Sequence, residues 1–295
     1  MNTHQRRTRA TRLWAGLAAF LIVPATIGIS APAASAAGSN KVTVTAGEYT
    51  YKVSGTPKPG NVEIVFDNAG TEYHMFGIVS LKPKVTAKQL KAAFLSDNES
   101  ASDKLVAGDG DIANTPGFLG PDQATTTITN LPAGHYGLFC FVAAPDGSPH
   151  VAHGMVKVFD VKGPKSTLKV PTDGVTEVSI TDAGITVPST GIPAKTWVKV
   201  TNDTSVTRDL SLGEYLTPDA TFETADAYFN EFFTTGKLPA GDPPASINGG
   251  VGAIAPGSSA YVEISLTNGG KYLFVSSNNE LDDDPNELHI DFTVG

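Results

Sequence analysis

The chain of 295 residues contains one cysteine, Cys140, so no disulfide can form within it. A lone thiol is reactive in an oxidising compartment unless it is buried or bound to a metal. It lies in the stretch CFVAAPDGSPHVAHGM, residues 140–155, which also holds two histidines and one of only three methionines. Cysteine, histidine and methionine are ligands that suit copper. The alternative is a buried thiol beside an ordinary surface loop.

Long apolar runs are also scarce, and the longest lies near the N-terminus. MNTHQRRTRATR is basic, LWAGLAAFLIVPATIGIS is apolar, and APAASA offers small residues for cleavage near Ala36. This order is typical of a secretory signal peptide. We therefore expect residues 1–36 to be removed after export, by the Sec or the twin-arginine route, and the protein to be secreted or periplasmic. Because no second long apolar run follows, we expect no membrane span in the mature chain.

Basic residues are few in the second half of the chain. The part after residue 36 carries 17 basic and 30 acidic residues, a net charge of −13. Residues 37–172 hold 12 residues of each sign, whereas residues 173–295 hold 5 basic and 18 acidic ones. This asymmetry argues against nucleic acid and anionic lipid as partners, and it suits a basic redox partner protein.

The sequence repeats itself loosely. NVEIVFDNAGTEYHMFGIVSL precedes a helical segment and TTTITNLPAGHYGLFCFV, just as WVKVTNDTSVTRDLSLGEYL precedes a helical segment and AYVEISLTNGGKYLFVSS. The helical segments are TAKQLKAAFLSDN, with a capping-box pattern from Thr86 to Gln89, and TFETADAYFNEFF. The remaining segments alternate and are rich in Val, Thr and Ile, which is typical of strands.

These patterns predict an all-β protein of two tandem Greek-key β-sandwich domains, each with one inserted helix. The first domain is expected at residues 37–162 and the second at 175–295. Between them, residues 163–174 are rich in Pro, Gly and Lys and predict a linker. One continuous sandwich of two sheets is the alternative.

The cysteine can be placed on this scaffold. If HYGLFC is a strand, Tyr136, Leu138 and Cys140 share one face, which we expect to be the core face. The turn-rich AAPDGSP segment then brings His150 and Met155 back to the same rim of the sandwich. A further group is available in NAGTEYHMFGI, where a histidine follows a turn and begins a strand.

The set His74, Cys140, His150 and Met155 resembles the four ligands of a cupredoxin, the type 1 blue-copper family. The Y-x-x-x-C approach and the H-x3-G-M ending look like plastocyanin, while HVAHGM is similar to the type 1 loop of copper nitrite reductases. The resemblance covers residues 40–162, with a weaker, degenerate copy at 175–295. It implies one mononuclear copper held equatorially by His74, Cys140 and His150, with Met155 axial, and single-electron transfer.

The chain departs from the family pattern in the cysteine loop and beside the first ligand. Met75 follows His74 where cupredoxins commonly have an asparagine that tethers the cysteine loop, so this support is missing or supplied otherwise. His153 is an alternative to His150, because Cys-x12-His-x-Met is an irregular but possible set. His135 lies on the opposite strand face from the cysteine and is expected to face solvent.

The second half lacks the corresponding ligands. Aligning the two repeats places Ser276 opposite Cys140, Arg208 opposite His74, and Leu288 opposite the methionine. If it shares the fold, this half is therefore expected to be free of metal.

Several enzyme classes are excluded. G-x-S-x-G and H-E-x-x-H are absent, and the five histidines after residue 36 are too few for the trinuclear site that the resemblance implies for a multicopper oxidase. Phe139 precedes the cysteine, so the His-Cys link to a catalytic copper is missing. A secreted electron carrier is the leading hypothesis. Extracellular copper binding or delivery without electron transfer, and a copper-free tandem β-sandwich scaffold or adhesion protein, are the alternatives.

Overall fold

The structure is a computed structural model that describes residues 40–108, 110, 112–278 and 287–294. The predicted signal peptide, residues 1–36, lies outside the described residues. The described chain is mostly β, as the alternating segments predict. No helix in these ranges is long and apolar enough to cross a membrane.

The two halves of the chain contain the following elements. The first half holds β1 (Lys41–Gly47), β2 (Thr50–Ser54), β3 (Gly60–Asn68), β4 (Gly77–Leu81), α1 (Ala87–Phe94), η1 (Glu99–Ala101), β5 (Thr115–Pro116), β6 (Ala124–Leu131), β7 (Gly134–Phe139), α2 (His150–His153) and β8 (Val156–Val161). The second half holds β9 (Val175–Thr181), β10 (Gly184–Thr186), β11 (Lys195–Asn202), β12 (Arg208–Tyr215), α3 (Phe222–Thr235), β13 (Ala245–Ile254), β14 (Ser259–Ser265), β15 (Lys271–Ser276) and β16 (Leu288–Thr293).

The strands of the two halves pair in the same order. In the first half β1 is parallel to β3 and β3 is antiparallel to β6, while β4, β7 and β8 form a second sheet. In the second half β9 is parallel to β11 and β11 is antiparallel to β14, while β12, β15 and β16 are neighbours in a second sheet. Each half therefore buries its own set of strand residues between two sheets.

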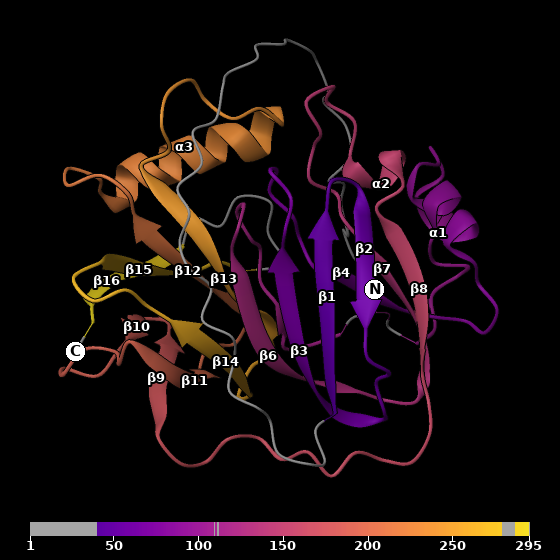
Figure 1. Cartoon of the computed structure of the whole chain (residues 1–295), viewed down its shortest axis with the longest axis horizontal. Helices are drawn as coiled ribbons and strands as arrows, with labels where there is room; N and C mark the ends of the chain where they lie inside the picture. The colour runs from indigo at the N-terminus through magenta and orange to yellow at the C-terminus, as the bar shows by residue number, and fades with distance from the viewer. Residues whose placement is uncertain (1–39, 109, 111, 279–286, 295) are drawn as a thin grey trace, which may run out of the picture.

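Two sheets run from one half into the other. β14 pairs with β6, which makes one eight-stranded sheet, and Figure 1 shows β14, β6, β3 and β1 side by side. β13 pairs with β5 and completes a five-stranded sheet. Residues 163–174, the predicted linker, contain no helix or strand. The halves are thus joined by backbone hydrogen bonds as well as by this segment, and the domain boundary stays a prediction.

Alternating side chains build the core of the first half. On β3, Val62, Ile64 and Phe66 are buried while their neighbours are half-buried. Burying a side chain of this kind stabilises a fold by about 1.5–3 kcal/mol. The pattern has period two, so a shift of one residue in register would turn the whole set away from the core.

Both predicted helices are present. α1 begins after Thr86, which forms the predicted capping box with Gln89. α3 begins after Thr221 and carries Phe232, which is buried in the core of the first half although it belongs to the second. Figure 1 shows α3 lying across β12 and β13. The helix therefore covers the junction between the halves, which the repeat pattern does not predict.

Asp209 on β12 carries a carboxyl group whose protonation affects the stability of the fold. Its Oδ1 accepts a hydrogen bond of 2.7 Å from the backbone N–H of Ser277, and burial raises the pKa of its carboxyl to about 7. A raised carboxyl pKa means that the folded state binds more protons than the unfolded state between about pH 4 and pH 7, so this group destabilises the fold as pH rises through that window.

We expect Asp209→Asn to be more stable than the wild type at pH 8. The difference in free energy of unfolding should grow by about 1–2 kcal/mol between pH 5 and pH 8, because the amide keeps the acceptor and removes the charge. Urea denaturation at both pH values measures this, with Asp219→Asn as an exposed control. An equal difference at both pH values would contradict the prediction.

Candidate metal centre

The loop after β7 folds back on itself through backbone hydrogen bonds. His150 N–H donates to the Val142 carbonyl (2.8 Å), Val151 N–H donates to the Cys140 carbonyl (2.9 Å), and Cys140 N–H donates to the Met155 carbonyl (3.3 Å). His150 begins the short helix α2, which the sequence analysis treats as loop. The cysteine and the first histidine of the loop are thereby brought together.

Gly154 lets the loop close behind α2. Its φ of 112° is in the region that favours glycine, and it follows the last residue of the helix. Met155 N–H then donates to the His150 carbonyl at 3.0 Å, and the chain enters β8. Met155 is fully buried at this closure, with its backbone bonded to both Cys140 and His150.

The side chain of Asn68 and the backbone of Leu119 fix the position of His74. Asn68 Nδ2 donates to the Glu72 carbonyl (2.8 Å), and Asn68 Oδ1 accepts from Gly70 N–H (3.0 Å), so the turn before the histidine is fixed by one side chain. The backbones of His74 and Leu119 exchange two hydrogen bonds of 2.9 Å. A Cβ on Gly70 would lie 3.0 Å from His74 Nε2, so the turn passes close to the ring.

Three donor atoms meet in the interior. His74 Nδ1 lies 3.1 Å from His150 Nδ1, and Cys140 Sγ lies 3.4 Å from His150 Nδ1 and 4.0 Å from His74 Nδ1. The circle through the three atoms has a radius of about 2.1 Å, close to zinc–nitrogen and zinc–sulfur bonds of about 2.0–2.3 Å. In the described part of the chain this is the one group of at least three such side chains with ligand spacing. One metal ion fits among them.

Burial controls the charge of these groups. Burial, and then the nearby His150, lower the pKa of His74 to about 4, and burial lowers the pKa of His150. Burial raises the pKa of the Cys140 thiol to about 11. At neutral pH the metal-free site therefore holds two neutral imidazoles and a thiol. The other ring nitrogen of His74, Nε2, is buried and has no hydrogen-bond partner among the described residues.

His153 and His135 lie elsewhere. The structure does not bring His153 into the cluster: its ring is exposed, stacks on Tyr49 at 4.5 Å and bonds to Ser148 Oγ at 2.6 Å. His135 was expected to face solvent, and this is wrong. Its ring nitrogens bond to Asp160 Oδ1 and to the Val85 carbonyl, both at 2.7 Å, because the segment before α1 covers this face of β7.

Tyr51 and Met75 connect the segment of His74 with the segment of Cys140. The Tyr51 hydroxyl lies 2.6 Å from the Met75 carbonyl and 3.0 Å from the Phe139 carbonyl. Met75 N–H points at Cys140 Sγ (3.5 Å), and Met75 Sδ accepts from Phe141 N–H (3.3 Å). These contacts tie together the two segments that carry His74 and Cys140. Sequence reasoning missed Tyr51, whose only signal is an aromatic residue at an alternating strand position.

Glu72 is the other residue that the sequence analysis overlooked. Its Oε2 lies 2.8 Å from His150 Nε2, and its Oε1 accepts from the Tyr49 hydroxyl at 2.9 Å. The only hint in the sequence is its place two residues before His74.

The second half shows what stands in the equivalent place. Arg208 Nη1 donates to the Ser276 carbonyl at 3.4 Å, so the two residues that align with His74 and Cys140 do meet. Asn202 repeats the role of Asn68, donating to the carbonyl four residues later (2.8 Å) and accepting from the N–H two residues later (3.0 Å). A guanidinium therefore occupies the position that the His74 imidazole has in the first half.

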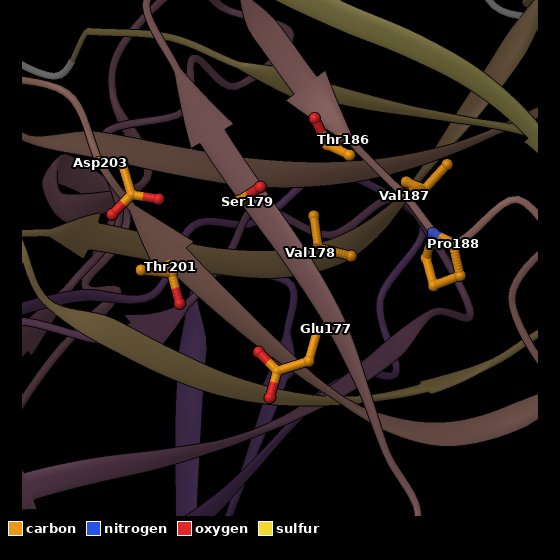
Figure 2. A pocket seen from close by; sticks show the side chains of 8 residues that line it. All are labelled: Glu177, Val178, Ser179, Thr186, Val187, Pro188, Thr201 and Asp203. Carbon is orange, nitrogen blue, oxygen red and sulfur yellow. The ribbon is translucent and has the colours of Figure 1, made fainter.

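A separate hollow of about 440 Å³ lies on the second half. Figure 2 shows its lining, which comes from β9, β11 and the segment around β10: Glu177, Val178, Ser179, Thr186, Val187, Pro188, Thr201 and Asp203. Lys199 Nζ pairs with a Glu177 carboxylate oxygen at 3.2 Å. No member of the donor cluster lines this hollow, so it has no part in the candidate metal centre.

Comparison with known proteins gives only distant likenesses. No family model matches the chain, and no curated protein matches its sequence. Among solved structures, reduced auracyanin from the photosynthetic bacterium Roseiflexus castenholzii is 27% identical over 43% of this chain and 99% of that chain, with a TM-score of 0.29. Auracyanin B is 16% identical over 43% of this chain and 93% of that chain, with a TM-score of 0.26. A multicopper oxidase is 12% identical over 86% of this chain and 88% of that chain, with a TM-score of 0.23. These TM-scores are too low to establish a shared fold.

Tyr51→Phe tests the brace, which is the name given to the contacts of the Tyr51 hydroxyl with the Met75 and Phe139 carbonyls. The substitution removes the hydroxyl that lies between the Met75 and Phe139 carbonyls, and loss of its hydrogen bond costs about 1–3 kcal/mol. We expect a lower melting temperature by calorimetry and a donor cluster that binds metal less tightly. Tyr261→Phe on β14 is the matched control, since no hydrogen bond of its hydroxyl is seen among the described residues. Equal melting temperatures for both variants would show that the brace contributes nothing.

Proposed function

We propose that this protein is a secreted cupredoxin-like carrier that transfers single electrons through one mononuclear type 1 copper. His74, Cys140 and His150 would hold the metal in a plane, with Met155 as the weak axial ligand. The observation that carries the proposal is the buried triangle of two Nδ1 atoms and one Sγ, with sides of 3.1, 3.4 and 4.0 Å. His153 takes no part, because its ring is bonded to Ser148.

The donor set favours copper over other metals. A trigonal His₂Cys set with a long axial methionine supports reversible Cu(I)/Cu(II) electron transfer, which is the chemistry that the metal supplies when bound. The protein's part is to hold the three donors in one place in both oxidation states. The backbone bonds among Cys140, His150 and Met155, together with the contacts of the Tyr51 hydroxyl, hold these segments in place.

We further propose that the two halves are tandem Greek-key sandwiches and that residues 175–295 are a degenerate copy of 37–162. The shared pairing order and the matching turns of Asn68 and Asn202 support this. So do Tyr136 and Tyr272, whose hydroxyls bond back to backbone a few residues upstream. In this copy Arg208 and Ser276 replace two ligands. Its acidic surface would attract a basic redox partner.

Copper storage or delivery is the second candidate function. Cys140, His74 and His150 are all fully buried, so a bound ion would exchange slowly. Slow exchange suits an electron carrier better than a donor of copper. A copper-free scaffold gives no reason to bury two imidazoles and a thiol with their Nδ1 and Sγ atoms 3.1–4.0 Å apart.

In the first experiment, one equivalent of Cu(II) is added to a protein that lacks residues 1–36. We expect one copper per chain and an intense blue colour. Cys140→Ser should lose the colour and weaken binding by more than about 100-fold, the upper range for changes around a metal site that leave its ligands intact. His153→Ala should keep both. Copper bound without colour and lost readily to a chelator would favour delivery, and no retained copper would leave the scaffold hypothesis.

Copper binding should release one proton near neutral pH. Burial raises the pKa of Cys140 to about 11, so the thiol is protonated in the metal-free protein and must lose its proton to bind. His74, with a pKa lowered to about 4, does not compete for protons above pH 5. Apparent affinity should therefore rise about tenfold per pH unit between pH 6 and pH 9.

Calorimetric titration in buffers of different ionisation enthalpy counts the released protons. A result of none per copper would mean that the thiol is not a ligand.

A further inference from the structure

We infer that Glu72 is a positioning residue of the copper site that sets the tautomer of His150 and lowers the copper reduction potential. This inference rests on the proposed function. It starts from the contact that His150 makes through the ring nitrogen that faces away from the donor cluster. His150 is fully buried, and its Nε2 lies 2.8 Å from Glu72 Oε2. Tyr49 lies edge-on to the ring at 5.0 Å.

The acceptor chemistry of Glu72 fixes the proton on His150. A carboxylate only accepts hydrogen bonds, so the contact requires a hydrogen on Nε2. In a neutral imidazole the other nitrogen, Nδ1, then carries the lone pair. That atom is the one that lies 3.4 Å from Cys140 Sγ and 3.1 Å from His74 Nδ1. Glu72 therefore directs the metal-binding nitrogen into the cluster before any metal arrives.

The carboxylate and the backbone of Glu72 are each held by a hydrogen bond. Its Oε1 accepts from the Tyr49 hydroxyl at 2.9 Å, and the Glu72 carbonyl accepts from Asn68 Nδ2 at 2.8 Å. Its side chain is 22% exposed, so solvent screens its charge only in part. These contacts hold the carboxylate group of Glu72 in one place beside His150.

A negative charge at this place favours the more positive ion. It stabilises Cu(II) more than Cu(I), so it lowers the potential at which an electron is accepted from the redox partner. Because the Glu72 side chain is only partly exposed, its effect on the reduction potential is larger than that of a carboxylate in open solvent. Asp146 provides the comparison, because it is an exposed carboxylate on the same loop that bonds to Ser148 and His153 instead.

The test compares copper-loaded wild type, Glu72→Gln and Asp146→Asn by redox titration. Glu72→Gln keeps an acceptor and removes the charge. We expect the ratio of Cu(II) to Cu(I) affinity to fall about 10- to 100-fold, which raises the potential by about 59–118 mV for one electron. Asp146→Asn should change the ratio less than about threefold. Equal shifts in the two variants, or none in Glu72→Gln, would overturn the role of the charge.

A second measurement needs no copper. In ¹⁵N NMR spectra of the metal-free wild type, His150 should carry its proton on Nε2, and Glu72→Leu should lose this preference. A proton on Nδ1 in the wild type, or an unchanged tautomer in Glu72→Leu, would overturn the positioning role. If the wild type takes up no copper, the proposed function fails, whereas the NMR result still decides whether Glu72 sets the tautomer.

Discussion

Burial of three donor atoms, two imidazole nitrogens and one thiol sulfur, around one point is the constraint on which the structure of the first half depends. A thiol and two imidazoles have to be withdrawn from solvent, which moves the pKa of each toward its neutral form. Neutral nitrogens keep their lone pairs, and the thiol gives up its proton only to a strong competitor such as a metal ion. The surrounding turns and the contacts of the Tyr51 hydroxyl hold these atoms within bonding reach of a single ion. The fold would therefore set the coordination geometry of a bound metal.

The sequence alone predicts the parts of this arrangement that follow from period and spacing. Alternation places Cys140 on the core side of its strand, and the capping box from Thr86 starts a helix as expected. It does not predict contacts between residues far apart in the chain. Tyr51 reaches Phe139 across 88 residues, and Glu72 reaches His150 across 78 residues, and no local pattern encodes either contact. Helix α2 was missed because four residues give too short a pattern.

The second half adds support that its own sequence does not reveal. α3 buries Phe232 in the first core, where its ring lies 5.2 Å from that of Tyr73, next to His74. β13 pairs with residues 115 and 116 and bridges to Leu119, the backbone partner of His74. The second half, in which Arg208 and Ser276 align with His74 and Cys140, thus contributes to the environment of the candidate site. Removing it would expose the strand edges that now join the halves.

X-ray absorption at the copper edge of the loaded wild-type protein tests the central claim most directly, because it reports the atoms bound to the metal. The account predicts one short copper–sulfur path and two imidazole nitrogen paths, with the sulfur path absent in Cys140→Ser. A shell made only of nitrogen and oxygen in the wild type would contradict it, and would place any bound copper outside the cluster of His74, Cys140 and His150.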